Sequence, residues 1–370
     1  MSRAASPAGA GSGAEREQRM LGIVHQTRAK QARFRDQQIT TAHGAGGKAS
    51  QSLIEGLLLP ALRNDALAAL GDAGMVSVNG TALALTTDSF VVTPIRFPGG
   101  SIGELAVNGT VNDLAVSGAR PLALTLSLVL EEGLPAAELR AEIDAVARAA
   151  DAAGVRVVAG DTKVVERGHA DRMYACTTGL GVLDPRARLS PSGLKDGDRI
   201  LVSGRIGEHG MAVMLARDEF ALEADIRSDT CSLWPAVDAL LGAAGPDLHC
   251  MRDATRGGVA SALNELARAS RVAALVREAD VPVAPAVAGA TELLGIDPMY
   301  VANEGKLVAF VAPDAADAAL AALRTVPGCE HAAEIGEVTL EPPGMVLVDT
   351  AFGGRRVMDL LAGDPLPRIC

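Results

Sequence analysis

The stretch TTDSFVVTPIRFPGGSIGELAVNGTVNDLAVSGARPLAL, residues 86–124, decides the fold of this 370-residue chain. It begins within an apolar run, 83–92, that is typical of a strand. The helical spacing of apolar residues over 102–119, closing on Gly118, predicts a helix. The apolar run 123–130 then predicts a buried strand. A strand, a helix and another strand in this order indicate a mixed α/β (α+β) protein.

The same alternation continues on both sides of this stretch, and a segment rich in Pro, Gly and Asp at 184–198 interrupts it. Before the interruption we predict helices at 48–62 and 135–154 and strands at 155–162 and 172–183. After it we predict strands at 198–204, 305–312 and 344–349, and helices within 207–217, 252–270 and 313–325. The sequence therefore predicts two α/β sandwiches, 40–185 and 186–360, between a disordered extension, 1–39, and a mobile tail, 361–370.

The composition excludes several classes of function. Net charge is −11 and only 2% of residues are aromatic, so neither a basic footprint nor base stacking supports nucleic-acid binding. The longest apolar stretch, 121–130, is too short to cross a membrane, and the N-terminus lacks the apolar segment of a signal peptide. The five cysteines form no metal-binding or disulfide pattern, which favours a reducing cytoplasm.

Four aspartates stand at strand ends or turns: Asp88, Asp113, Asp161 and Asp253. Mg²⁺ prefers carboxylate oxygens together with substrate phosphates, so convergence of these side chains would form an ATP–Mg²⁺ site. The alternative for each aspartate alone is a helix cap or a turn, which is the commoner role. Asp253 is the strongest member, because the turn it opens, Asp-Ala-Thr255-Arg-Gly-Gly, leads into a helix N-terminus suited to anions.

Two glycine-rich stretches resemble nucleotide-binding motifs without matching them. HGAGGK, 43–48, lacks the first glycine of a P-loop and has Ala49 where that motif needs Ser or Thr. It still places a flexible loop and Lys48 before a predicted helix, where amides can hold phosphate; a plain loop is the alternative. In GRIGEHG, 204–210, the glycines are three apart, so a structural turn is favoured over a dinucleotide site.

The combined run at 86–124, with VVAGDTKVV (157–165), MRDATRGG (251–258), PMYVANEGK (298–306) and terminal PRIC (367–370), resembles one family. It is similar to the HypE family of hydrogenase maturation proteins, the carbamoyl dehydratases, within the superfamily of aminoimidazole ribonucleotide synthetase. The resemblance covers about residues 40–370, and the terminal cysteine is specific to HypE among its relatives. It implies a PurM-like fold of two domains and a homodimer formed through the N-terminal domains.

The resemblance also implies a role for each matching residue. Asp88, Asp113 and Asp253 are the implied metal carboxylates, and Asp161 is assigned to metal or nucleotide. The implied nucleotide contacts are Gly46, Gly47, Lys48, Asn112, Thr162 and Thr255. Lys163 and Glu304 are the candidate bases for the amide nitrogen; their structural alternatives are a surface lysine and a salt bridge to Lys306.

In the implied reaction a carbamoyltransferase of the HypF kind loads Cys370, and ATP phosphorylates the oxygen of the resulting S-carboxamide. Loss of phosphate leaves a thiocyanate, whose cyanide passes to iron on a HypC–HypD-type complex. Phosphorylation converts a poor leaving oxygen into a good one, and phosphoryl transfer needs mainly positioning and charge neutralisation.

The terminal segment GDPLPRIC fits this chemistry. Extended, its eight residues span roughly 26–29 Å, so the thiol can visit both an internal site and a partner. We expect the tail to contribute little packing and Arg368 to raise the thiolate fraction slightly. The remaining cysteines, 176, 231, 250 and 329, are interpreted as buried small hydrophobes or bystanders.

Two alternatives remain open. The first is a sibling enzyme that phosphorylates a free small molecule such as selenide or a ribonucleotide amide; the lack of a cysteine before Cys176 argues against a selenophosphate synthetase. The second is a carrier whose terminal thiol only shuttles a group between partners. A carrier needs no Mg²⁺–ATP site, so the aspartate turns argue against it.

Overall fold

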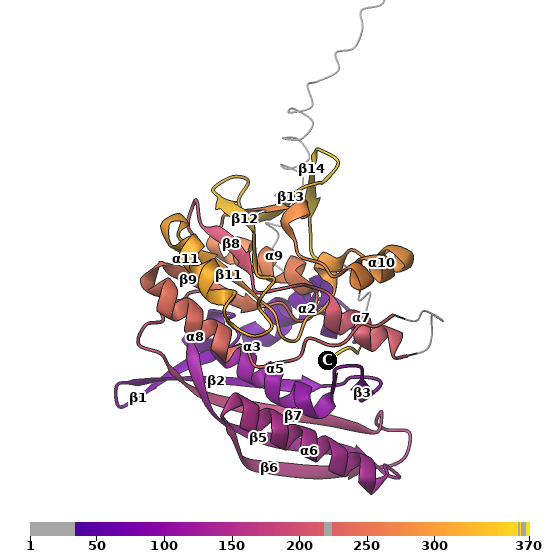
Figure 1. Cartoon of the computed structure of the whole chain (residues 1–370). Coiled ribbons are helices and arrows are strands. Elements are labelled where there is room, and N and C mark those ends of the chain that lie inside the picture. The colour runs from indigo at the N-terminus through magenta and orange to yellow at the C-terminus, as the bar shows by residue number, and fades with distance from the viewer. Residues whose placement is uncertain (1–33, 218–223, 362, 364–367) are drawn as a thin grey trace, which may run out of the picture.

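The computed structural model describes residues 34–217, 224–361, 363 and 368–370. Two sheets, one on each side of residue 185, form the frame of the molecule (Figure 1). The predicted extension at 1–39 lies almost wholly outside the described residues, as do residues 364–367 of the predicted tail. The expected mixed α/β architecture of two domains is confirmed, while the exact domain limits stay a prediction.

The N-terminal sheet has five strands in the order β1-β2-β7-β5-β6. Its strands are β1 (Gly74–Val78), β2 (Thr81–Phe90), β5 (Ala119–Glu131), β6 (Arg156–Val165) and β7 (Met173–Leu183). Only β5 and β6 run parallel, because the helix α6 (Ala136–Ala153) carries the chain back between them. A short hairpin of β3 (Arg96–Phe97) and β4 (Gly100–Ser101) precedes α5 (Ile102–Val116).

Helix α5 lies between the two halves of the molecule, which explains its composition. Thirteen of its fifteen residues are buried, and it contacts α6, β2, β5 and β7 as well as α8 and β9 of the second half. A helix that is apolar on all sides is stable only when it is covered on all sides. The stretch that decides the fold therefore forms the joint between the domains.

The C-terminal sheet has seven strands in the order β14-β13-β10-β12-β8-β11-β9. Its strands are β8 (Arg199–Val202), β9 (Leu248–Asp253), β10 (Ala273–Arg277), β11 (Leu307–Val311), β12 (Ala333–Thr339), β13 (Met345–Asp349) and β14 (Arg355–Met358). Helices α7 (Glu208–Leu215), α8 (Trp234–Ala243), α9 (Gly258–Ser270), α10 (Pro285–Leu294) and α11 (Pro313–Leu323) pack around it. Short helices η3 (Gly245–Asp247), η4 (Glu278–Asp280) and η5 (Pro298–Tyr300) complete this half.

The predicted helix at 48–62 is present but irregular. It is divided into α2 (Lys48–Leu53), a π-helical turn η2 (Ile54–Leu58) and α3 (Leu59–Leu62), flanked by η1 (Thr41–Gly44) and α4 (Asp65–Ala68). Among the described residues, no helix is long and apolar enough to cross a membrane. Strands β1, β10, β12 and β14 and helices α8 and α10 were not predicted from the sequence.

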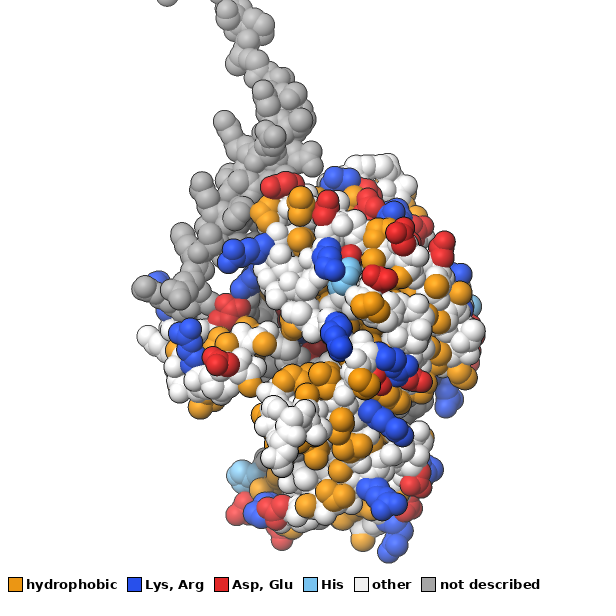
Figure 2. Space-filling model, turned by 90° about the vertical axis from the view of Figure 1, so that its left-hand side faces the viewer, with side chains coloured by type: hydrophobic (Ala, Val, Ile, Leu, Met, Phe, Trp, Pro, Cys, Tyr) orange, Lys and Arg blue, Asp and Glu red, His pale blue; other side chains and the backbone are white. Residues whose placement is uncertain are grey.

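Several strands of the N-terminal sheet carry exposed apolar side chains. Val158 and Val164 of β6 are each about two-thirds exposed, at 65% and 67%. Strands β1, β2 and β5 add Met75, Val76, Val78, Leu85 and Leu122, all exposed. Figure 2 shows hydrophobic side chains gathered over the lower, N-terminal half of the molecule. We call this set the exposed apolar residues of the sheet.

Candidate functional site

Four aspartates from distant parts of the chain meet between the two sheets. The nearest carboxylate oxygens of Asp72, Asp113 and Asp253 all lie within 4.8 Å of one another. Asp88, on β2, lies beside them and lines the same cavity as Asp113 and Asp253. We call Asp72, Asp88, Asp113 and Asp253 the acidic cluster. The predicted convergence of Asp88, Asp113 and Asp253 is therefore present in the structure.

Each member of the acidic cluster is placed by regular structure. Asp113 projects from the joint helix α5 and accepts a hydrogen bond of 2.7 Å from the Thr86 hydroxyl of β2. Asp88 accepts one of 3.1 Å from the Thr110 hydroxyl, one helical turn before Asp113. Asp253 is the last residue of β9. The fold thus crowds four carboxylates together, and threonine hydroxyls donate to two of them, Asp113 and Asp88.

This crowding changes the acidity of the carboxyls. Burial raises the pKa of Asp113 well above its ordinary value, and the negative charges of Asp88, Asp253 and Asp72 raise it further. Burial and the Asp72 charge likewise raise the pKa of Asp253 well above normal. Four such groups are costly together unless protons or a cation neutralise them. Oxygen-only ligands fit a hard divalent cation such as Mg²⁺.

Asp72 was missed by the sequence interpretation. It lies in Gly-Asp-Ala-Gly, 71–74, just before β1, and this turn carried the same Gly/Asp signal as the other sites. Arg252 holds it in place: its Nε lies 3.1 Å from Asp72 Oδ1, and its Nη1 donates to Glu265 at 2.5 Å. Burial raises the pKa of Asp72, and the Arg252 charge opposes that rise.

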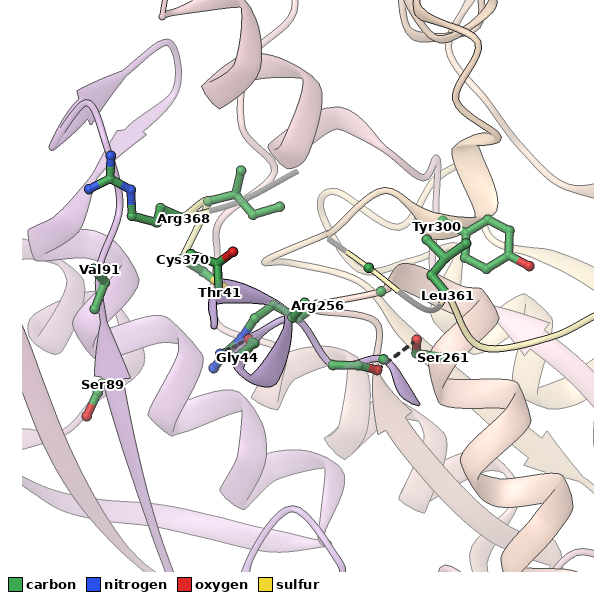
Figure 3. Close-up of a pocket in the computed structure, with 16 residues that line it drawn as sticks. Thr41, Gly44, Ser89, Val91, Arg256, Ser261, Tyr300, Leu361, Arg368 and Cys370 are labelled. Carbon is green, nitrogen blue, oxygen red and sulfur yellow. Dashed lines mark hydrogen bonds between the residues drawn. The ribbon is translucent and has the colours of Figure 1, made fainter. Parts of the chain in front are cut away.

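A second cavity, of about 200 Å³, opens beside the acidic cluster and is bordered by the glycine loop. Its lining comprises residues 44–47, Thr41, Ser89, Val91, Arg256, Gly257, Ser261, Tyr300, Leu361, Gly363 and 368–370. Figure 3 shows Ser89 and Val91 on one side and Ser261 and Tyr300 on the other, with Cys370 between. We call it the glycine-loop cavity.

The glycines of this loop are required by close backbone approach. Gly46 has φ +72°, and a Cβ there would lie 3.0 Å from the Arg256 carbonyl oxygen. A Cβ on Gly47 would lie 2.5 Å from the Leu361 carbonyl oxygen. Gly47 precedes α2, and the Lys48 amide donates to that same carbonyl at 3.0 Å. Lys48 itself does not line the cavity, and its Nζ binds Asp359 Oδ2 at 2.9 Å.

Arg256, which was not singled out from the sequence, joins the two cavities. It lines both of them, and its Nη1 donates to the Gly44 carbonyl oxygen at 2.8 Å. Arg256 stays a cation, because an ionised Cys370, Asp88 or Glu304 beside it would raise its pKa. Among the described residues, Arg256 is the basic residue that lines both the cavity at the acidic cluster and the glycine-loop cavity.

Cys370 and Glu304 meet at the acidic cluster. Both line the small cavity of about 40 Å³ that also contains Asp88, Asp113, Asp253, Thr255 and Arg256. Burial raises the pKa of Glu304 well above normal, and the Asp253 and Asp229 charges add to this. The backbone of Glu304 is fixed, because its amide donates to Asp229 Oδ1 at 3.0 Å. Glu304 is therefore a buried carboxyl directly beside a thiol.

The described end of the tail departs from two expectations. Ile369 is 5% exposed and belongs to an apolar cluster with Phe90 and Phe97, so the prediction that the tail contributes little packing is wrong for residues 368–370. Burial raises the pKa of Cys370 to about 12, with Glu304 adding to the rise and Arg256 opposing it. The expected gain in thiolate from Arg368 is thus wrong for this position of the tail.

Asn112 has other partners than the expected nucleotide. Its amide nitrogen donates to the carbonyl oxygens of Cys231 and Glu304, at 3.0 and 3.1 Å, and its oxygen accepts from the Leu233 amide at 2.7 Å. The side chain is 1% exposed and lines neither cavity. Asn112 ties α5 to the second half of the chain, and its contact with a nucleotide stays a prediction.

Three predicted site residues lie elsewhere in the single chain. Asp161, Thr162 and Lys163 are exposed on the edge strand β6, where Lys163 pairs with Asp161. Asp161 and Thr162 line a separate open groove of about 720 Å³ with residues 157–160. One chain therefore does not bring them to the acidic cluster, and their roles stay predictions. The salt bridge considered for Glu304 is also absent, since Lys306 pairs with Asp229 at 3.3 Å.

The remaining cysteines agree only in part with their interpretation. Cys250 and Cys329 are buried, Cys176 is half-buried, and Cys231 is exposed. None of the four lines the two cavities described above.

Comparison with known proteins identifies the family. The N-terminal and C-terminal domains described as AIR synthase related protein match residues 70–183 and 195–348. Carbamoyl dehydratase HypE of Bradyrhizobium diazoefficiens is 47% identical over 332 residues, covering 90% of this chain and 96% of the relative. A HypE structure in complex with ATP is 43% identical with a TM-score of 0.75, covering 90% of this chain and 100% of the other.

A solved HypE–HypF complex contains a chain that is 43% identical, with a TM-score of 0.79 over 84% of this chain and 99% of that one. Identity above 40% over nearly the whole length of the relatives goes beyond a shared fold. On this evidence the chain belongs to the HypE family of carbamoyl dehydratases.

Proposed function

We propose that the chain uses ATP and Mg²⁺ to dehydrate an S-carboxamide on its own Cys370 to a thiocyanate, which supplies cyanide for the iron of a [NiFe]-hydrogenase. The observation that carries this proposal is the position of Cys370. Its side chain lines both the glycine-loop cavity and the small cavity at the acidic cluster. A terminal residue placed there is a substrate presented to a phosphoryl-transfer site.

The donor set supports the nucleotide and the metal. Asp72, Asp113 and Asp253, with Asp88 beside them, would hold Mg²⁺, which when bound neutralises phosphate charge. The amides of the glycine loop and the Arg256 guanidinium border the cavity that the phosphates would enter. The ATP-bound HypE relative supports the same ligand for this chain.

The reaction balances in two steps. The carboxamide oxygen attacks the terminal phosphorus of ATP, one nitrogen proton is lost, and ADP leaves. The second nitrogen proton then goes to a base as the carbon–oxygen bond breaks, which yields thiocyanate and inorganic phosphate. Glu304 is the candidate base, because its buried carboxyl has a raised pKa and lies beside Cys370. Arg256 is placed to hold the charge that develops on the oxygen.

Loading of the thiol requires a different position of the tail. A thiol with a pKa of about 12 is protonated at neutral pH and is a poor acceptor. Cys370 is also half-buried where it lies. We infer that the carbamoyltransferase, a HypF-like partner, meets the cysteine outside the cavity, and that a HypC–HypD-type complex later takes the cyanide there. The HypE–HypF structure of the relative supports the first partner.

We also propose a homodimer through the exposed apolar residues of the sheet. Its apolar side chains on β1, β2, β5 and β6 form a large unpaired surface, which in soluble proteins marks an interaction site. Asp161, Thr162 and Lys163 lie on the same edge strand, β6. If they act at a nucleotide site, a second copy must bring them there, because their own chain does not.

Mass spectrometry of the intact protein tests the proposal. The chain is incubated with carbamoyl phosphate, ATP, Mg²⁺ and the carbamoyltransferase, and its C-terminal peptide is followed. We expect the peptide to gain a carboxamide and then to lose one water when ATP is present. A C-terminal peptide that stays unmodified refutes the assignment, and ATP turnover that is unchanged in Cys370→Ala favours a sibling enzyme. Cyanide formation by Asp113→Ala favours the carrier.

A further inference from the structure

The rest of the protein binds the last three residues through contacts that the proposed reaction does not itself require. Arg368–Cys370 lie antiparallel to residues 91–93, which follow β2. The Val91 amide donates to an oxygen of the Cys370 terminal carboxylate and the Thr93 amide to the Arg368 carbonyl oxygen, both at 3.2 Å. Such addition of a strand to a free backbone edge is a common mode of peptide recognition. We call these three residues the docked tail.

The side of the docked tail that faces away from residues 91–93 is also bound. His209 Nε2 lies 2.7 Å from the Ile369 carbonyl oxygen. His209 is completely buried, and its ring packs edge-on against Phe97 with centroids 5.4 Å apart. A carbonyl only accepts, so Nε2 carries the proton, and Nδ1 accepts from the Ser228 hydroxyl at 2.8 Å. Burial lowers the pKa of His209, which agrees with a neutral ring.

Arg217 adds two further hydrogen bonds. Its Nη2 donates to the Arg368 carbonyl oxygen and its Nε to the Thr93 carbonyl oxygen, both at 2.8 Å. The Arg368 side chain points elsewhere, to Asp171 on the surface. The Arg368 and Ile369 carbonyls and the Cys370 terminal carboxylate are therefore all bound, while the Arg368 side chain is exposed.

Among the side chains of the docked tail, that of Ile369 makes the apolar contacts. Its side chain enters the apolar cluster that includes Phe90, Val92, Phe97 and Met211. Because alternate residues of a strand face opposite sides, seating Ile369 fixes the faces on which its two neighbours lie. The seated isoleucine thus sets the position of the next residue, Cys370, at the acidic cluster.

We propose that Ile369 is the specificity-determining residue of the docked tail and that His209 positions it, so that the enzyme selects its thiol as the cysteine following a buried isoleucine. This inference rests on the proposed function, which it deepens. The substrate is an Xaa-Ile-Cys strand that is recognised through its backbone and through one apolar side chain. Arg368 contributes its carbonyl but not its side chain.

The test uses the full-length chain and measures how fast iodoacetamide labels Cys370, by peptide mass spectrometry. Labelling reports the undocked fraction and needs no dehydration chemistry. Ile369→Ala removes three buried carbons, which at the usual transfer free energy raises the labelling rate roughly 50-fold. Ile369→Val removes one carbon and raises it about 4-fold. Arg368→Ala is the matched control and changes it less than about 3-fold.

His209 is tested with two variants, because loss of a buried histidine affects folding as well. His209→Leu cannot donate to the Ile369 carbonyl and raises the labelling rate about 5- to 30-fold. In His209→Gln a side-chain amide donor remains, and labelling returns toward the wild-type rate. Thermal unfolding of each variant confirms that the fold is retained.

The two proposals fail in different ways. Wild-type labelling rates in both Ile369→Ala and His209→Leu, or an effect of Arg368→Ala as large as that of Ile369→Ala, overturn this inference. In that case thiocyanate formation by the wild-type chain still supports the proposed function. If the variants show the expected labelling rates but the wild type forms no thiocyanate, the binding of the docked tail is supported and the proposed function is refuted.

Discussion

Replacing Asp113 by Asn tests the electrostatics of the acidic cluster. The change keeps the size and the acceptor oxygen for Thr86 but removes one negative charge from the centre of the cluster. Without a metal the wild-type protein must hold these carboxyls close together. We therefore expect Asp113→Asn to be more stable than the wild type in the absence of Mg²⁺ and less stable in its presence.

The magnitude follows from the geometry. Two unit charges at 4.8 Å, the limit within which the oxygens of Asp72, Asp113 and Asp253 lie, repel by about 3.5 kcal/mol at an effective dielectric constant of 20. Protons taken up by the raised-pKa carboxyls relieve part of this. The variant should gain about 1–3 kcal/mol without metal. The wild type should gain about 2.7 kcal/mol from Mg²⁺ at a hundred times its dissociation constant, and the variant much less.

The pH dependence has a definite sign. The folded-state pKa of Asp113 is raised above the unfolded value of 3.8. Its contribution to stability is therefore complete below about pH 3.8 and is lost as the pH rises through the folded-state pKa. The advantage of Asp113→Asn over the metal-free wild type should accordingly grow as the pH rises from about 4.

Urea unfolding at several pH values, with EDTA or with Mg²⁺, measures these differences. Asp317→Asn on the exposed surface of α11 is the matched control and should change stability by less than about 0.5 kcal/mol. The reasoning is refuted if Asp113→Asn is the less stable protein in EDTA. It is also refuted if Mg²⁺ stabilises the variant as much as the wild type.

Three further predictions concern the reaction and the assembly. Glu304→Gln should leave ATP binding unchanged in calorimetry but slow single-turnover dehydration of loaded Cys370 about 100-fold or more; an unchanged rate removes Glu304 as the base. Arg256→Lys should slow the same step about 10-fold or more, while Mg²⁺ still stabilises the protein. If Mg²⁺ no longer stabilises the slowed variant, Arg256 has a structural role. Val158→Asp, among the exposed apolar residues of the sheet, should give a monomer in sedimentation, whereas an unchanged dimer places the interface elsewhere.

The sequence predicted the parts of the site that carry a local signal. Asp253 ends a strand as expected, whereas Asp88 lies within strand β2 and Asp113 within helix α5; the expected convergence of the three is nevertheless present. Asp72 carries the same signal in a shorter turn and was overlooked. Arg256 was not recognised, because only the folded chain shows that it reaches from the helix N-terminus to the Gly44 carbonyl.

Long-range pairing explains what was missed in the fold and the tail. Strands β10 and β14 are short, and their partners lie far along the chain or across a turn, so five residues such as AALVR carry no periodic signal of their own. The composition of the terminal segment predicts a loose tail. What buries Ile369 is a cluster built from residues such as Phe90 and Met211, which no local pattern connects to it.

The central claim is that the oxygen of a carboxamide on Cys370 leaves the protein as part of phosphate. Carbamoyl phosphate with a heavy isotope of oxygen in its carbonyl group loads the chain, and mass spectrometry follows the label after ATP and Mg²⁺ are added. We predict that the label appears in inorganic phosphate, one atom for each thiocyanate formed. Label that is released in water or stays on the protein, with unlabelled phosphate, would contradict the account.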